Sequence, residues 1–195
     1  MLTPADLVAF ETDVAERFNR AEIPYPVHLS GGNESQLLEL FRQIERTDWV
    51  FSTYRSHYHA LLHGVPRDVL MAELLAGRSM NLCWPAHRFY TSAIVGGMLP
   101  IAVGVAASLK RADSGALVWC FIGDMAASGG AFHEARRYAT GHALPIRFVV
   151  EDNGLSCDTP TVTTWGTKVM SGGMVRRYEY GRQHPHVGTG EFVQF

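Results

Sequence analysis

Apolar residues recur at two kinds of spacing along this chain of 195 residues. Spacings of three and four residues predict helices, whereas continuous apolar runs of about four to eight residues predict strands buried on both faces. The helical pattern occupies residues 4–20, 35–44, 66–76, 93–110 and 129–140. The short apolar runs occupy residues 48–53, 117–122 and 145–150. This alternation predicts a single α/β domain over residues 1–195, with helices flanking a parallel sheet.

Two segments of the chain lack a regular period. Residues 78–92 combine polar and aromatic side chains, and we expect a functional loop there that forms part of a pocket wall. Residues 170–195 are rich in Gly, Arg, Tyr and His, and residues 176–180 within them predict an edge strand. His184 and His186 lie in the same tail and fit a surface turn better than a place in a site.

The composition argues against several classes of protein. A formal net charge of −2 does not suit non-specific binding to nucleic acid, which needs a basic surface. No apolar stretch approaches the roughly 20 residues of a membrane-spanning helix, and the N-terminal segment has no signal-peptide core. Cys83, Cys120 and Cys157 form no Cys-x-x-Cys motif. We therefore expect a cytoplasmic protein with reduced thiols and without nucleic-acid or membrane partners.

Oxygen-bearing side chains directly follow two of the predicted buried strands. Gly-Asp-Met occupies residues 123–125 after the first, and Glu-Asp-Asn-Gly occupies residues 151–154 after the second. In a parallel sheet the carboxyl ends of the strands meet at one edge, where ligands bind. Asp124 offers a negative charge and Asn153 a neutral carbonyl oxygen, which suits Mg²⁺ held against a diphosphate. Backbone amides after Asp124, at the start of the predicted helix 128–140, would face the phosphates.

An arginine and a tyrosine extend this interpretation. Arg55 can form two parallel hydrogen bonds to a phosphate, and Tyr54 can donate one more. Taken singly, the motif around Asp124 is typical of a helix cap and the motif around Asn153 is typical of a turn. Their combination on successive strands, with a helix between them, is what favours a metal–diphosphate site.

Other chemistries fit the sequence poorly. The spacing of His57, His59 and His63 suggests zinc, but no nearby cysteine or carboxylate completes a closed site. The glycines of residues 93–110 do not form Gly-x-Gly-x-x-Gly after a strand, which argues against a dinucleotide. The sequence contains neither a P-loop nor a Gly-x-Ser-x-Gly elbow.

Together these segments resemble the alpha subunit of thiamine-diphosphate-dependent 2-oxo-acid dehydrogenases, the decarboxylating component of those enzymes. The resemblance covers residues 24–163, and the order and spacing of its motifs make it specific. The motifs that carry it are His-Leu and Gly-Asn-Glu within 28–34, Tyr-Arg-Ser-His at 54–57, Arg-Ser-Met at 78–80, Phe-Tyr at 89–90, Ile-Val-Gly at 94–96, Gly-Asp at 123–124, Phe-His-Glu-Ala at 132–135 and Glu-Asp-Asn-Gly at 151–154.

The resemblance implies thiamine diphosphate and Mg²⁺ as cofactors, and it implies roles for particular residues. The metal shell would consist of Asp124, Asn153 and the carbonyl oxygen of Leu155. The backbone of Val95 would contact the aminopyrimidine, and His57 is the expected catalytic residue. The full set expected to bind the cofactor is Tyr54, Arg55, Val95, Gly123, Asp124, Met125, Ala126, Asn153 and Leu155.

Two substitutions depart from the family pattern. Met125 and Ala93 each stand where the family has a glycine. Met125 lacks the freedom of glycine to adopt a positive φ, which weakens the expected diphosphate contact through the amides of Met125 and Ala126. The tail also lacks a clear counterpart of the later active-site loops of the family, so we expect a short and divergent member.

The activity that the resemblance implies is cleavage of a C–C bond next to a carbonyl group, in the first instance decarboxylation of a 2-oxo acid with transfer of the acyl group. The family activates its cofactor with a glutamate on a separate pyrimidine-binding domain, for which this chain has no room. We therefore expect an oxidoreductase or transferase subunit that works only with a beta-type partner in an α2β2 assembly, and that delivers to a lipoyl or acyl-carrier protein. Two alternatives stay open: a transketolase-type transfer of a two-carbon ketol to an aldehyde or carrier, and a non-catalytic scaffold, which Met125 suggests.

Overall fold

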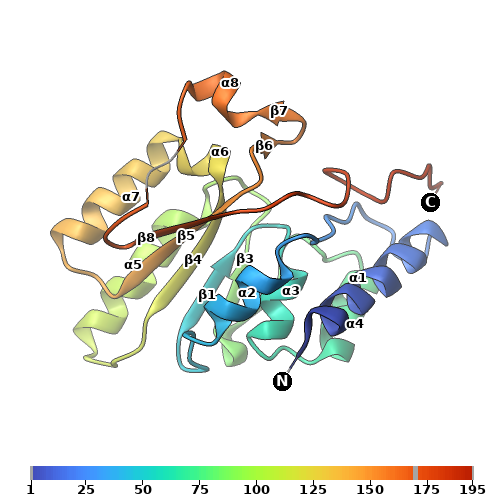
Figure 1. Cartoon of the computed structure of the whole chain (residues 1–195). Coiled ribbons are helices and arrows are strands. Elements are labelled where there is room, and N and C mark those ends of the chain that lie inside the picture. The colour runs from blue at the N-terminus through green and yellow to red at the C-terminus, as the bar shows by residue number, and fades with distance from the viewer. Residues whose placement is uncertain (1, 169–170, 195) are drawn as a thin grey trace.

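A mainly parallel sheet organises the computed structural model, which describes residues 2–168 and 171–194. Within these residues the strand order is β2-β3-β1-β4-β5-β8, and neighbouring strands are parallel except for β2 with β3 (Figure 1). The α/β architecture that the sequence predicts is confirmed. Met170 and Phe195, which bound the predicted irregular tail, lie outside the described residues. In sheet order the strands are β2 (Cys83–Trp84), β3 (Phe89–Thr91), β1 (Trp49–Ser52), β4 (Val118–Gly123), β5 (Ile146–Asp152) and β8 (Val175–Glu179).

Helices cover both faces of the sheet, because successive residues of a strand point to opposite sides. In β4, Phe121 packs in one core, whereas its neighbours Cys120 and Ile122 pack in the other. The second core is covered by α5 (Met98–Arg111) and α7 (Gly130–Gly141), as Figure 1 shows. The first core is covered by α1 (Pro4–Asn19), α2 (Glu34–Phe41), α3 (His57–Leu62) and α4 (Arg67–Leu75).

The helix predicted over residues 93–110 begins only at Met98, and residues 93–97 form a turn instead. Gly96 has a φ of +74°, which a right-handed helix does not accommodate. The turn leaves the side chains of Ile94 and Val95 72% and 67% exposed beside the cavity described below.

Short elements account for most other differences from the sequence-based expectation. The segment 78–92, expected to be a loop, contains β2, a 3-10 turn at Pro85–His87 and β3. These elements are two or three residues long, too short to produce a periodic signal. The edge strand expected at 176–180 is confirmed as β8, which lies parallel to β5.

A small lobe follows β5 and lies above the carboxyl end of the sheet (Figure 1). It consists of the hairpin β6 (Leu155–Ser156) and β7 (Thr159–Pro160), followed by α8 (Thr161–Trp165). Beside it, α6 (Asp124–Ala127) forms a single turn at the end of β4. In the part of the chain that the structure describes, no helix has the length and apolarity needed to cross a bilayer.

Asp48 is a buried carboxylate that ties the start of β1 to β4. Its side chain is 3% exposed and accepts hydrogen bonds from the amide of Leu117 at 2.8 Å and the indole of Trp119 at 3.0 Å. It also accepts one from the amide of Glu45 at 3.1 Å. Three donors on two segments, residue 45 and residues 117–119, therefore depend on one side chain.

We expect Asp48→Ala to lower the free energy of unfolding by about 3 kcal/mol, because buried donors lose their acceptor together. Urea unfolding followed by circular dichroism measures this loss. The matched control is Glu39→Ala, which removes an exposed carboxylate on α2 and should change the same quantity by less than about 0.5 kcal/mol. Equal losses in the two variants would contradict an anchoring role for Asp48.

Candidate functional site

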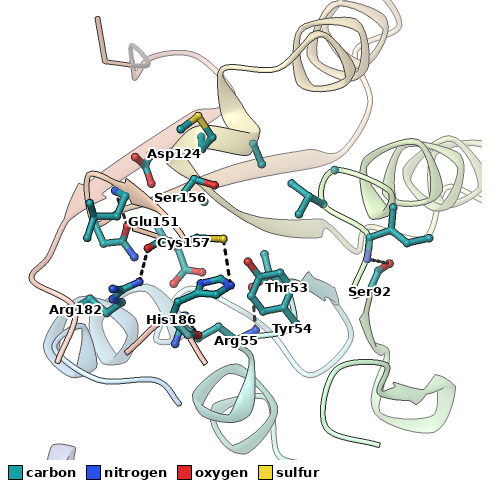
Figure 2. A pocket seen from close by; sticks show the side chains of 18 of the residues that line it. Thr53, Tyr54, Arg55, Ser92, Asp124, Glu151, Ser156, Cys157, Arg182 and His186 are labelled. Carbon is teal, nitrogen blue, oxygen red and sulfur yellow. Dashed lines mark hydrogen bonds between the residues drawn. The ribbon is translucent and has the colours of Figure 1, made fainter. Parts of the chain in front are cut away.

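A cavity lies at the carboxyl-terminal edge of the sheet and encloses about 770 Å³ including its mouth, a size typical of small-molecule sites. Its walls come from the segments that directly follow β1, β3, β4, β5 and β8. Figure 2 shows polar side chains from several of these segments turned toward one space. Every residue that the sequence assigns to the site lines the cavity except His57; these are Tyr54, Arg55, Val95, Gly123, Asp124, Met125, Ala126, Asn153 and Leu155.

Among the described residues, Asp124 is one of two buried carboxylates that line this cavity, the other being Glu151, and it begins α6 directly after β4. It accepts a hydrogen bond from the hydroxyl of Thr161 at the start of α8. Burial raises the pKa of Asp124, the bond from Thr161 opposes that rise, and the nearby charge of Asp152 adds to it. The ionised form therefore lacks part of its solvation, which a bound cation would replace.

Met125 replaces the glycine of the family without backbone strain, which corrects the expectation from sequence. It lies inside α6 with right-handed helical backbone, so no positive φ is required. Its sulfur accepts a hydrogen bond of 2.9 Å from the indole of Trp165. The long helix α7 begins at Gly130, within two residues of the predicted start, so α6 is a separate turn that the sequence did not predict. The amides of Met125 and Ala126 consequently belong to α6, a single turn that offers them no acceptor four residues back.

The turn after β5 fixes the orientation of Asn153. Its Oδ1 accepts the amide of Leu155 at 3.0 Å, and its Nδ2 donates to the hydroxyl of Tyr180 at 3.2 Å. A carbonyl oxygen has two lone pairs, so Oδ1 retains the capacity to bind a metal ion. Asp152 serves the turn instead, since it accepts the amide of Gly154 at 2.9 Å and pairs with Arg177.

Arg55 lines the cavity, but its side chain already has partners. Nη1 donates to the carbonyl of Leu29 at 2.5 Å, and Nη2 donates to the carbonyl of His186 at 2.9 Å. Burial lowers the pKa of Arg55, as expected for a guanidinium withdrawn from water. These bonds use two of the five N–H groups of the guanidinium, so the predicted contact with a phosphate would use the remaining donors. Tyr54 stands beside it at the end of β1 and its hydroxyl is drawn toward the cavity in Figure 2.

The structure does not bring His57 into the cavity. Its side chain is fully buried on α3, and Nδ1 lies 3.0 Å from Oε2 of Glu11 on α1. Glu11 also accepts the amide of Ser30 at 2.9 Å. A catalytic residue must touch the reactants, so this placement argues against the catalytic role expected for His57 and favours a role in holding α1 and residue 30 beside the site.

The neighbouring His59 and His63 are also buried, and each contacts a different residue. His63 Nε2 lies 3.1 Å from the carbonyl of Asp48. His59 Nε2 lies 3.3 Å from Oε1 of Glu151, without hydrogen-bonding geometry. Among residues 2–168 and 171–194, no three side chains of His, Cys, Asp or Glu are close enough together to hold a metal ion.

Sequence reasoning missed several residues of the cavity wall. The tail after β8 folds back, so Arg182 and His186 line the cavity, whereas His186 was expected in a surface turn (Figure 2). No periodic pattern marks that segment, and nothing in the sequence could have placed it here. Glu151 carries a weak signal, because it lies two residues before the predicted metal ligand Asn153. The other lining residues outside the predicted set are Thr53, Ser92, Ile94, Gly96, Met98, Ser156, Cys157 and Tyr180.

Comparison with known proteins agrees with this geometry. The family model described as "Dehydrogenase E1 component" matches residues 5–172. The chain belongs to this family. The alpha subunit of acetoin:2,6-dichlorophenolindophenol oxidoreductase from Bacillus subtilis is 31% identical over 166 residues, which cover 80% of this chain and 50% of the relative. The pyruvate dehydrogenase E1 component subunit alpha of Porphyra purpurea is 33% identical over 161 residues, which cover 74% of this chain and 47% of the relative.

The chain thus spans about half the length of these curated relatives of the E1 family. A solved structure from Mycobacterium smegmatis, provisionally described as a thiamin diphosphate-dependent enzyme, is 22% identical with a TM-score of 0.40. It covers 60% of this chain, and this chain covers 20% of it. That likeness is too distant to add to the argument.

His28 is a buried histidine that contacts both the cavity-lining Tyr54 and the tail residue His186. Its side chain is 7% exposed, and its ring lies 4.3 Å from that of Tyr54 and 5.2 Å from that of His186, measured between centroids. Burial, followed by the positive charge of Arg55, lowers the pKa of His28 from 6.5 to about 3. The imidazole is therefore neutral in the folded protein at physiological pH.

This burial predicts a dependence of stability on pH. Between a pKa of about 3 in the folded chain and 6.5 in the unfolded chain, only the unfolded state binds the proton of His28. The free energy of unfolding should therefore fall as pH drops from 6.5, by up to about 1.4 kcal/mol per pH unit for this one group. Urea unfolding at several pH values should show a shallower slope for His28→Gln, because glutamine does not titrate. An unchanged slope would show that His28 is protonated in the folded chain.

Proposed function

We propose that this chain is the diphosphate-binding part of a thiamine-diphosphate-dependent enzyme that decarboxylates a 2-oxo acid and transfers the acyl group. One observation carries the proposal. Residues predicted from four separate segments of the sequence, around positions 54, 95, 124 and 154, line a single cavity at the carboxyl end of a parallel sheet. That edge is where open α/β sheets bind phosphorylated cofactors.

The residues present suit the cofactor and its metal ion. Asp124 offers a carboxylate, Asn153 an amide oxygen and Leu155 a backbone carbonyl, which together form the all-oxygen set that Mg²⁺ prefers. Met125 and Ala126 line the same cavity, where their backbone amides would donate to phosphate oxygens. The exposed side chains of Ile94 and Val95 form an apolar wall suited to a heterocyclic ring.

When bound, thiamine diphosphate supplies the electron sink that allows a C–C bond next to a carbonyl to break. The chain's own residues bind and orient. Asp124 and Asn153 would fix the metal ion and, through it, the diphosphate. Val95 would set the position of the ring system by contact with its backbone. Thr161 and Tyr180 would hold Asp124 and Asn153 in place, because each already forms a hydrogen bond with one of them.

A partner subunit completes the proposal. We infer that a beta-type chain with a pyrimidine-binding domain supplies the activating glutamate, in an α2β2 assembly, and that a lipoyl or acyl-carrier protein accepts the product. The exposed apolar side chains beside the cavity agree with a second wall supplied from outside this chain. The scaffold alternative loses its basis, since Met125 fits the helical turn without strain.

We expect Asp124→Ala to abolish the Mg²⁺-dependent part of thiamine diphosphate binding, because the only anionic metal ligand of the proposed shell is lost. Isothermal titration with the chain copurified with its beta-type partner, at saturating and at zero Mg²⁺, measures this. The control Asp68→Ala removes an exposed carboxylate on α4 that does not line the cavity, and should bind as the unaltered chain does. Retained metal-dependent affinity in Asp124→Ala would refute the metal assignment. Product analysis with an aldehyde and with a lipoyl acceptor then separates acyl transfer from ketol transfer.

Met125→Gly, which restores the family residue, should not tighten cofactor binding. The helical backbone already fits methionine, so glycine should instead destabilise the turn by about 1 kcal/mol and remove the contact with Trp165. Thermal unfolding and the same titration test both effects. An increase in affinity would show that the methionine side chain obstructs the diphosphate.

A further inference from the structure

Two reactive side chains at the cavity wall take no part in the proposed function. The Sγ of Cys157 lies 3.4 Å from Nε2 of His186, as the dashed line in Figure 2 marks. Cys157 is exposed, and both residues line the cavity. They come from distant segments, the β6–β7 turn and the tail after β8, so the pair exists only in the folded chain.

The thiol is held in position by its backbone. Ser156 pairs with Thr159 in the hairpin, so Cys157 lies in the two-residue turn between them. Its φ of +51° lies in the left-handed region, which residues other than glycine rarely adopt. Arg182 holds this turn, because Nη1 donates to the carbonyl of Cys157 at 2.7 Å and Nη2 donates to Asp158 at 2.9 Å. The thiol is therefore presented toward His186.

Nε2 of His186 is the ring nitrogen that faces the thiol, at 3.4 Å. Burial, followed by the charges of Arg55 and Arg182, lowers the pKa of His186, so the ring is neutral at physiological pH. Its backbone carbonyl accepts the hydrogen bond from Arg55, which fixes the residue over the cavity. Behind it, Nδ1 of His28 is buried without a hydrogen-bond partner, and its neutral ring adds no competing charge.

We propose that Cys157 is a modification site, at which the thiol reacts with peroxides and other small soft electrophiles while His186 takes up the thiol proton. With hydrogen peroxide, the sulfur attacks one oxygen as the O–O bond breaks, and the proton passes through Nε2 of His186 to the departing hydroxide. The products are a sulfenic acid and water, so sulfur is oxidised by two electrons and the peroxide is reduced. Small thiols can reverse this modification.

Modification would also block the cavity, an effect that rests on the proposed function. The added oxygen would lie on a side chain that lines the space assigned to the cofactor. A bound cofactor and a modified Cys157 should therefore exclude one another.

The other cysteines provide matched references within the chain. Cys83 is also exposed, but its sulfur has no hydrogen-bond partner among the described residues. Cys120 is buried in β4, where burial raises the pKa of its thiol and solvent cannot reach it. One experiment can therefore compare Cys157, which has His186 beside it, with an exposed cysteine that has no base bonded to it in the described part of the chain, Cys83, and with a buried one, Cys120.

The test is the rate of modification of each cysteine in the full native chain, by iodoacetamide and by hydrogen peroxide with dimedone trapping, read by peptide mass spectrometry. We expect Cys157 to react about tenfold faster than Cys83, with Cys120 unmodified. In His186→Gln the rate at Cys157 should fall to within about threefold of that at Cys83. Circular dichroism and thermal unfolding establish that this variant is folded, and Cys157→Ser assigns the modified peptide. Equal rates at Cys157 and Cys83, or no effect of His186→Gln in the folded variant, would overturn the proposal.

A second measurement separates this proposal from the proposed function. Thiamine diphosphate with Mg²⁺, added to the chain in complex with its partner, should protect Cys157 and leave Cys83 unaffected. Fast modification of Cys157 in the chain alone supports the modification site whatever the cofactor does. Fast modification without protection would overturn the placement of the cofactor in this cavity.

Discussion

The register of β4 against β5 is the constraint on which the site depends. Gly123 pairs with Glu151, so the two strands end at the same level and their next residues enter one cavity. A shift of one residue would move Phe148 and its neighbours from one core to the other, because strand side chains alternate between faces. Both faces of β5 pack against helices, so the shifted side chains would not fit the core on either side. Hydrophobic packing and site geometry are therefore fixed by the same hydrogen bonds.

A layer of buried polar groups separates the first core from the cavity. Glu11 links α1 to α3 through His57 and also accepts a hydrogen bond from the amide of Ser30. The carbonyl of the preceding residue, Leu29, accepts a hydrogen bond from Arg55. Buried polar groups cost stability unless they are bonded, and Glu11 supplies partners for Nδ1 of His57 and the amide of Ser30, whereas Nε2 of His57 and the hydroxyl of Ser30 have none among the described residues. The layer connects α1, far from the cavity, to the arginine that lines it. The position of Arg55 therefore depends on packing in the first core as well as on contacts within the site.

The sequence was sufficient for residues whose chemistry and position are set locally. Asp124 and Asn153 directly follow long buried strands, so strand periodicity and sheet topology place them without knowledge of the rest of the fold. It was insufficient where long-range packing decides. His57 lies two residues after the cavity-lining Arg55, yet α3 turns its side chain into the core. His186 has no periodic context, and only the return of the tail across the sheet edge brings it to the cavity.

The tail joins the separate parts of the site through its contact with Arg55. One guanidinium holds both the segment before α2, through Leu29, and the tail, through the carbonyl of His186. A guanidinium carries five N–H groups, so Arg55 can keep both carbonyls while its remaining donors face a ligand, and one side chain would then position the tail and serve the site. The imidazole of His186 also faces Cys157, so movement of the tail would change the environment of the thiol. The segment before α2, the tail and the environment of the thiol are therefore connected through the half-buried Arg55.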